Sequence, residues 1–194
     1  MSYEEKRVKV KVFGTLPKSH KHLVAIPSVE GKSERLHTLA AQSFGRLAEA
    51  AEQAVGVKVL AASGWRAHKW ASWAEYEKTM IAKYGSLADG RKKMAFDSPH
   101  ETGLAVDFGT GGLEPRSATS DTQRKTPLHK WLVEHACEFG WHPYKNEPWH
   151  WEHAVSLESY SSGVIGEDDP GYVEPVSFDV GEDDEFVEEE ELDE

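Results

Sequence analysis

The sequence predicts one domain in which helices and strands are mixed, followed by an acidic tail. Its 194 residues are enough for a single domain with a hydrophobic core. Apolar residues recur every three or four positions from Leu36 to Ala51, which is typical of a helix with one buried face. A short, mostly apolar stretch such as Val57 to Ala61 is typical of a strand. Charge is concentrated at the C-terminal end, where 15 acidic and no basic residues occur from Ser161 onward.

The N-terminal segment is predicted to stand apart from the main domain. Residues 1–20 are assigned to an arm or an edge strand, because Val8 to Val12 alternates apolar and basic side chains with a period of two.

The main domain is assigned to residues 21–160. Its first apolar run, Leu23 to Ile26, is expected to be a short strand that ends at Pro27.

The helix with the apolar face is expected to begin after Ser33 and to end at Gly56. The elements expected after it are, in order, a strand at 57–61, a helix at 72–84, a loop at 85–99 and a strand at 104–108. The turn-rich segment from Gly109 to Lys125 could then form a flap over a site.

Two further elements complete the predicted domain. Thr126 followed by Pro127 predicts the start of a helix, since threonine caps helix N-termini and proline suits the first helical position. This helix is expected to end at Gly140. Residues 149–154 are predicted to form a final strand. Its alternation divides four side chains between two faces, Trp149 and Trp151 on one and His150 and Glu152 on the other.

The charge of the chain differs between its body and its tail. The formal net charge is −12, but the chain before Ser161 holds 19 acidic against 22 basic residues and is mildly basic. Residues 161–194 have too little apolar content to bury a core and are predicted to be disordered. Three roles for this tail stay open: a solvating segment, a docking segment for a basic partner, or a self-contact that covers the basic body and obstructs its cleft.

Several classes of protein are excluded or disfavoured. No apolar run is long enough to insert in a membrane, and the N-terminus lacks the apolar stretch of a signal peptide, so we expect a soluble protein that the usual export route does not carry. A nucleic-acid partner is not expected. Cys137 is the single cysteine, which excludes an internal disulfide and a thiolate metal cluster. Any metal ion must be held by histidine and carboxylate.

Two separated stretches, Ser98 to Asp107 and Glu147 to His150, carry the side chains of a candidate metal site. If the strands that bear them are neighbours, three side chains can occupy three corners of a tetrahedron around one Zn²⁺ and leave the fourth to water. These predicted ligands are His100, Asp107 and His150. Zinc lowers the pKa of its bound water from ~15.7 toward ~7, and a carboxylate beside that water can accept its proton.

Two residues are predicted to be catalytic. Glu147 is the expected general base, because it lies three residues before a predicted ligand. Arg66, which follows Ser63-Gly64-Trp65 at the end of a predicted strand, is the expected group that stabilises the developing oxyanion. Its alternative role is a structural ion pair that anchors the loop.

Other side chains are candidates for binding substrate. Ser98 is expected to orient its loop or Asp107 by a hydrogen bond rather than to act as a nucleophile, because no His–Asp pair is placed to activate it. Three more residues are candidate walls of the cleft: Trp65, Trp149 and His142. His142 could equally lie in an exposed loop. His153 is disfavoured as a ligand, because it lies three positions after the predicted histidine ligand and so on the other face of the strand.

The motif Ser98-x-His100-x-x-Gly103-x-Ala105-x-Asp107, followed by Glu147-x-Trp149-His150, resembles the zinc D-alanyl-D-alanine carboxypeptidases of the vancomycin-resistance type and their phage endolysin relatives, the L,D-endopeptidases. The element Ser63-Gly64-Trp65-Arg66 is similar to a Ser-Gly-Tyr-Arg element of that family. The resemblance covers roughly residues 34–155. Two stretches depart from the family pattern, Ala67 to Ser72 and His150 to His153, and both touch specificity more than metal binding.

The resemblance implies an α+β fold with a small central antiparallel sheet and flanking helices, shared with hedgehog signalling domains. It also implies that the substrates are stem peptides of peptidoglycan, cut at bonds flanked by D-amino acids by a carboxypeptidase or an endopeptidase. A phage lysin of this kind would reach the cell wall on lysis or as a virion component. Two alternatives stay open, a cytoplasmic D-Ala-D-Ala dipeptidase and a non-catalytic, zinc-stabilised binding module.

Overall fold

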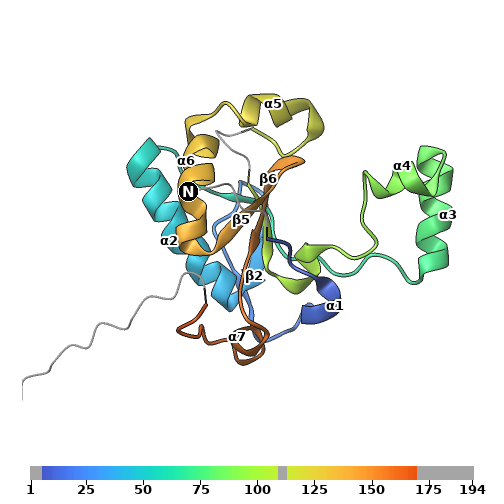
Figure 1. The fold of residues 1–194 in the computed structure, drawn as a ribbon, viewed down its shortest axis with the longest axis horizontal. Helices are drawn as coiled ribbons and strands as arrows, with labels where there is room; N and C mark the ends of the chain where they lie inside the picture. Colours follow the sequence, from blue (N-terminus) through green and yellow to red (C-terminus); the bar gives the residue numbers. More distant parts are fainter. Residues whose placement is uncertain (1–5, 109–112, 170–194) are drawn as a thin grey trace, which may run out of the picture.

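A four-stranded antiparallel sheet forms the centre of the molecule (Figure 1). The computed structural model describes residues 6–108 and 113–169. The strands lie in the order β3-β4-β6-β5, with bounds Ala61–Ser63, Ala105–Phe108, Glu147–His153 and Trp141–Tyr144. The predicted α+β class with a small antiparallel sheet is confirmed.

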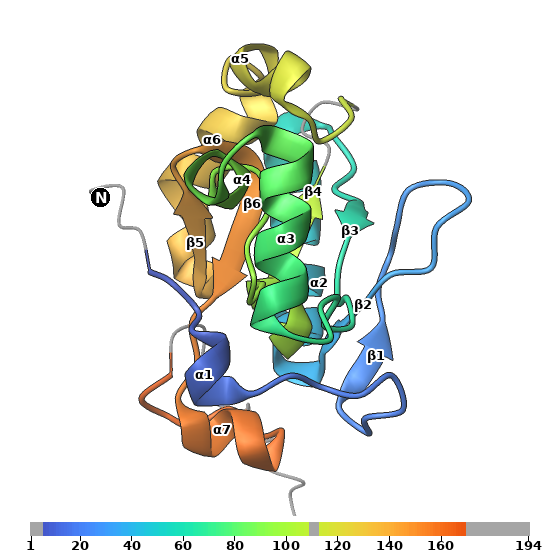
Figure 2. The same ribbon diagram turned by 90° about the vertical axis from the view of Figure 1, so that its right-hand side faces the viewer.

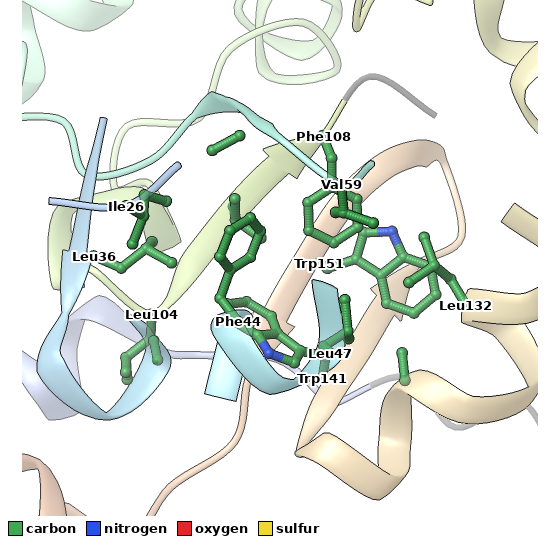
Figure 3. Packing of buried hydrophobic residues seen from close by; sticks show 14 of the residues in the cluster. Ile26, Leu36, Phe44, Leu47, Val59, Leu104, Phe108, Leu132, Trp141 and Trp151 are labelled. Carbon is green, nitrogen blue, oxygen red and sulfur yellow. The ribbon is translucent and has the colours of Figure 1, made fainter. Parts of the chain in front are cut away.

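One face of this sheet is covered by helices α2 (Thr38–Val55) and α6 (Pro127–His135). Figure 3 shows side chains from both helices and from the sheet packed in one cluster, among them Phe44, Leu47, Leu132, Phe108, Trp141 and Trp151. Each of these is almost fully buried. Because side chains alternate along a strand, the residues between these core positions point to the other face of the sheet. That second face is the polar one.

A second, two-stranded sheet pairs β1 (Leu23–Ala25) with β2 (Arg35–His37) and leads directly into α2. His37 caps this helix, since its Nδ1 accepts the Leu39 N–H at 3.3 Å. The predicted helix therefore begins at Thr38 rather than just after Ser33. Leu36 fits the helical spacing by chance: it lies on β2, and its side chain is buried there.

Helices α3 (Trp73–Tyr84) and α4 (Leu87–Arg91) project to one side of the sheet and pack on each other (Figures 1 and 2). They have a small hydrophobic cluster of their own, built on Trp70, Tyr76 and Met80. The predicted helix at 72–84 is confirmed, with Ser72 as its N-cap and Gly85 as its left-handed C-cap. The predicted loop at 85–99 was wrong in part, because Ser86 caps the short helix α4.

The remaining elements are short. They are α1 (Val10–Phe13), η1 (Pro99–Thr102), η3 (Ser117–Thr119), α5 (Ser120–Gln123), η4 (Ala136–Phe139) and α7 (Leu157–Ser162), where η denotes a 3₁₀ helix. The helix predicted from Thr126 to Gly140 is confirmed as α6 followed by η4. In the part of the chain that the structure covers, no helix has both the length and the apolar character needed to cross a membrane.

Two strand predictions need correction. The alternating stretch Val8 to Val12 does not form an edge strand: the chain is an extended arm as far as Lys9 and then turns into α1. The Val8 N–H donates to a carboxylate of Glu152 instead of to a neighbouring strand. The strand expected at 57–61 is β3, which begins only at Ala61.

The structure describes the first nine residues assigned to the tail, 161–169. Helix α7 extends to Ser162. Asp169 is 8% exposed, and its carboxylate accepts hydrogen bonds from the Ser156 and Gly166 backbone N–H groups. The predicted flap lies in part, at 109–112, outside the described residues, and so do residues 170–194. The three roles considered for the tail therefore stay predictions.

His37 gives the fold a predicted dependence on pH. The side chain is fully buried, with Nε2 3.1 Å from the Tyr160 carbonyl and 3.3 Å from His22 Nδ1. Burial, with a smaller contribution from His22, lowers the pKa of His37 from 6.5 to about 4. In the unfolded chain His37 therefore binds a proton below pH 6.5, whereas in the folded protein it binds one only near pH 4. Stability from this group is complete above pH 6.5 and is lost as the pH falls toward 4.

We predict that the free energy of unfolding, measured by urea denaturation, falls between pH 7 and pH 4, with up to ~3 kcal/mol of the loss due to His37. The variant His37→Asn keeps a side-chain oxygen for the helix cap and removes the titrating group. Its stability should decline less over the same pH range. Equal declines in the two proteins would show that another group is responsible.

Candidate metal centre

The two central strands place a carboxylate and an imidazole side by side. Asp107 on β4 lies directly opposite His150 on β6 in the antiparallel register, so both side chains stand on the polar face of the sheet. His100 reaches the same point from η1, which precedes β4. Gly103 allows this approach, because it has φ 72° and leaves no room for a Cβ, which would lie 2.8 Å from the His37 backbone nitrogen.

Three donor atoms converge at this point. His100 Nε2 lies 3.2 Å from Asp107 Oδ1 and 3.2 Å from His150 Nδ1, and the latter lies 2.8 Å from Asp107 Oδ1. A tetrahedral ion with bonds of ~2.0–2.1 Å has donor atoms about 3.3 Å apart. All three side chains are buried, with exposures of 1%, 8% and 5% for His100, Asp107 and His150. These residues therefore fit a single small metal ion with nitrogen and oxygen ligands.

Each imidazole is oriented by a partner on its other nitrogen. His100 Nδ1–H donates to the Gly64 carbonyl at 2.7 Å, which leaves the Nε2 lone pair directed at the centre. His150 Nε2–H donates to Glu152 Oε1 at 3.0 Å, which makes Nδ1 the nitrogen that faces the centre. Such partners fix the tautomer and ring orientation of metal-binding histidines.

The charges of the three groups are coupled. Burial opposes ionisation of Asp107, but the two imidazoles outweigh it and hold the pKa of this carboxyl well below its usual range. Burial also lowers the pKa of His100. For His150, burial is outweighed by the carboxylates of Asp107 and Glu152, which raise its pKa to about 9. The site therefore holds a firmly ionised carboxylate between two imidazoles, which suits a cation.

The centre opens into a cavity of about 300 Å³. Its lining includes His100, His150 and three other residues singled out from the sequence, Arg66, Glu147 and Ser98. Arg66 is exposed, and its backbone N–H donates to the His100 carbonyl at 3.3 Å. Glu147 is the first residue of β6, on the strand that carries His150. Ser98 donates its backbone N–H to Glu101 Oε1 at 3.0 Å, so its hydrogen bonding orients the loop.

The other three candidates for substrate binding are not among the described residues that line this cavity. Trp149 is 8% exposed and has the same strand parity as Trp151. Trp65 packs partly against the core, with the Arg35 guanidinium 5.0 Å from its ring centre. His142 is not in a loop: it lies on β5 opposite Glu152 and is 3% exposed. Substrate contact by these three side chains stays a prediction.

The loop that carries His100 is anchored by Glu101. This carboxylate is 3% exposed and also accepts from the Thr15 hydroxyl at 2.9 Å and from His68 Nδ1 at 3.0 Å. His68, Glu101 and Asp97 form a second group of neighbouring donors. The Glu101 oxygens are already bonded to three groups within the protein, so its role is to hold η1 in place.

Sequence reasoning missed the partners of the two imidazoles. Glu152 was assigned to the same strand face as His150, and residues two apart on one face are neighbours, so this signal could have identified the pair. The Gly64 carbonyl is backbone, and nothing in the residue type indicates its role. A Cβ at Gly64 would lie 2.4 Å from the Arg35 carbonyl oxygen, which explains why glycine is needed there.

A buried three-ligand site that opens into a cavity with a carboxylate and a guanidinium is the arrangement of a metal-dependent hydrolase. The model of the family VanY, D-alanyl-D-alanine carboxypeptidase, matches residues 33–156, and the chain belongs to this family. The match includes all three donor residues, Arg66 and Glu147, and excludes the N-terminal arm.

Two solved structures are similar to this chain. One is a variant of the vancomycin-resistance D,D-pentapeptidase VanY from a VanB-type resistance cassette, in complex with Zn(II), with 22% identity and a TM-score of 0.44 over 78% of this chain and 90% of that chain. The other is VanYB in complex with D-alanine-D-alanine, with 22% identity and a TM-score of 0.44 over 78% and 89% of the two chains. No curated protein sequence matches the chain.

We predict that Gly64→Ala weakens metal binding. The added Cβ must displace the backbone whose carbonyl orients His100, so the affinity for Zn²⁺ should fall by ~10–100-fold in a chelator competition. Gly45→Ala is the matched control, because a Cβ at this exposed position in α2 meets nothing within 4 Å and should leave stability unchanged or raised. A folded Gly64→Ala protein with wild-type affinity would contradict the role of this carbonyl.

Proposed function

We propose that this chain is a zinc-dependent carboxypeptidase that removes the terminal D-alanine from peptidoglycan stem peptides ending in D-Ala-D-Ala. The observation that carries the proposal is the meeting of three buried donor atoms, 2.8–3.2 Å apart, at a cavity that Glu147 and Arg66 also line. Membership of the D-alanyl-D-alanine carboxypeptidase family supports the same activity.

The protein groups divide the chemistry between them. His100, Asp107 and His150 would hold the ion, and bound zinc supplies a water of lowered pKa and polarises the peptide carbonyl. Glu147 is positioned by β6 on the same strand as His150, and in our proposal it accepts the proton of the attacking water and returns it to the leaving amine. The Arg66 guanidinium stabilises the negative charge that develops on the peptide carbonyl oxygen.

The charge of the cavity supports a substrate with free carboxylates. Six of the lining side chains are cationic, Arg7, Arg66, Lys69, Arg91, Lys92 and Lys93, against the two carboxylates of Glu101 and Glu147. A terminal D-alanine presents a free α-carboxylate to such a surface. We therefore favour carboxypeptidase over endopeptidase activity, and with it a role that does not require lysis of the wall.

We predict that Glu147→Gln lowers kcat by at least ~10²-fold while one equivalent of zinc still binds. Gln keeps the size of the side chain and removes its ability to accept a proton. The assay is mass spectrometry of products from a synthetic stem pentapeptide ending in D-Ala-D-Ala, with and without a chelator, in parallel with zinc analysis. Loss of one D-alanine that the chelator abolishes is the expected wild-type result.

Other outcomes of this assay would redirect the proposal. Cleavage inside purified crosslinked walls would indicate an endopeptidase or lysin, and cleavage of free D-Ala-D-Ala alone would indicate a dipeptidase. Zinc bound without turnover of any of the three substrates would indicate a binding module. Full activity of Glu147→Gln would contradict the mechanism.

We predict that Arg66→Ala lowers kcat/KM by ~10²–10³-fold and that Arg66→Lys restores only part of the loss, since a lysine supplies charge without the planar fork. The side chain is exposed and the bond that Arg66 makes to His100 is from its backbone, so the fold should survive both substitutions. Kinetics on the stem pentapeptide and urea denaturation separate the two effects. An Arg66→Ala enzyme with wild-type kcat/KM would leave only the anchoring role.

A further inference from the structure

We propose that Glu152 is a positioning residue for the metal ligand His150, and that the N-terminal arm, residues 6–9, completes the site by holding Glu152. This inference rests on the metal site of the proposed function. The arm lies outside the family match, which begins at residue 33. Figure 2 shows the arm, in dark blue, passing beside β5 and β6 before it enters α1.

Glu152 is a carboxylate inside the protein, with 1% exposure. Its Oε1 accepts from His150 Nε2 at 3.0 Å and is 2.9 Å from Arg7 Nη2, and its Oε2 accepts the Val8 N–H. A buried carboxylate is costly unless it is paired and hydrogen-bonded. Two of these three described partners, Arg7 and Val8, belong to the arm, so the arm stabilises a charge at this position.

The same contacts explain how Glu152 acts on the metal site. A carboxylate fixed on both oxygens can only accept, so His150 must place its proton on Nε2. The other nitrogen, Nδ1, is then the one that faces the centre, where Asp107 Oδ1 lies 2.8 Å away and His100 Nε2 3.2 Å away. Without the carboxylate, the ring could turn or take the other tautomer, and the third donor atom would be lost from the centre.

The arm also reaches the cavity itself. The Arg7 guanidinium lies 3.9 Å from the centre of the Tyr144 ring, and Arg7 and Tyr144 both line the cavity with His150 and Glu147. Val8 is 8% exposed and belongs to the hydrophobic core, which fixes the arm beside these residues. One segment therefore pairs with the carboxylate behind His150 and contributes a cation to the substrate side.

The test measures zinc affinity by competition with a chromophoric chelator in the full-length protein, a readout that does not depend on activity. We expect Glu152→Ala to weaken zinc binding by ~10–100-fold, the range typical of the partners of metal-binding histidines. Glu152→Gln keeps an acceptor oxygen and should fall between this variant and the wild type. Arg7→Ala leaves the carboxylate in place and should weaken zinc binding in the same direction by a smaller factor.

Two matched controls are available away from the site. Glu138 also accepts from a histidine, with Oε1 3.1 Å from His135 Nδ1, but on the surface, so Glu138→Gln should leave zinc affinity unchanged. Arg116 forms an exposed ion pair with Glu114 at 3.1 Å, and Arg116→Ala should likewise have no effect. Denaturation of each zinc-free protein shows whether a variant is merely less stable.

The outcomes are distinct. Weaker zinc binding by folded Glu152→Gln and Arg7→Ala, with both controls at the wild-type value, supports the inference. If Glu152→Ala does not fold, these two variants decide alone. Wild-type affinity in folded Glu152→Gln and Arg7→Ala would overturn the inference and leave the proposed function intact. A wild-type protein that binds no zinc would overturn both.

Discussion

The pairing of β4 with β6 is the constraint on which the rest of the site depends. In this register Asp107 stands opposite His150, and Ala105 stands opposite Glu152. A shift by one residue would turn every side chain of one strand to the other face, which would bury His150 in the core and expose Trp151. The core side chains Val106, Phe108 and Trp151 therefore fix the donor side chains that alternate with them. Hydrophobic packing on one face specifies polar geometry on the other.

The polar face must then satisfy several buried charges at once. Asp107 is ionised between two imidazoles, and each imidazole has its second nitrogen bonded to the protein, one to the Gly64 carbonyl and one to Glu152. Glu152 is bonded in turn to the N-terminal arm. The site is thus a connected hydrogen-bond network in which each group restricts its neighbour, and this restriction is what preorganises donor atoms for a metal ion.

The sequence predicted which three side chains meet at the candidate metal centre, because their chemistry is encoded in residue type. His100, Asp107 and His150 are the kinds of side chain that hold zinc, and the period of two along the last strand indicated which of them share a face. The prediction required the strand of Asp107 and the strand of His150 to be neighbours, and in the structure β4 and β6 are paired. Family resemblance made the same residues stand out from the other histidines.

What the sequence did not predict has physical causes of its own. Strand β5 was missed because Trp141-His142-Pro143-Tyr144 is too short to show a period and contains a proline, which an edge strand can accommodate. Val8 to Val12 alternates as an edge strand would. In the described part of the chain, however, the Val8 N–H donates to the Glu152 carboxylate and the Val8 side chain packs in the hydrophobic core. Arg7 and Glu152 are in contact although most of the domain separates them along the sequence. Local sequence patterns carry no information about contacts at that separation.

The central claim is that three side chains bind one metal ion through the three atoms that the hydrogen-bond network directs at the centre. The most direct measurement is anomalous diffraction at the zinc edge from crystals of the zinc-loaded protein. The account predicts a single strong peak within bonding distance of His100 Nε2, Asp107 Oδ1 and His150 Nδ1. A peak beside His150 Nε2 and Glu152 instead, or no peak between residues 100, 107 and 150, would contradict this claim.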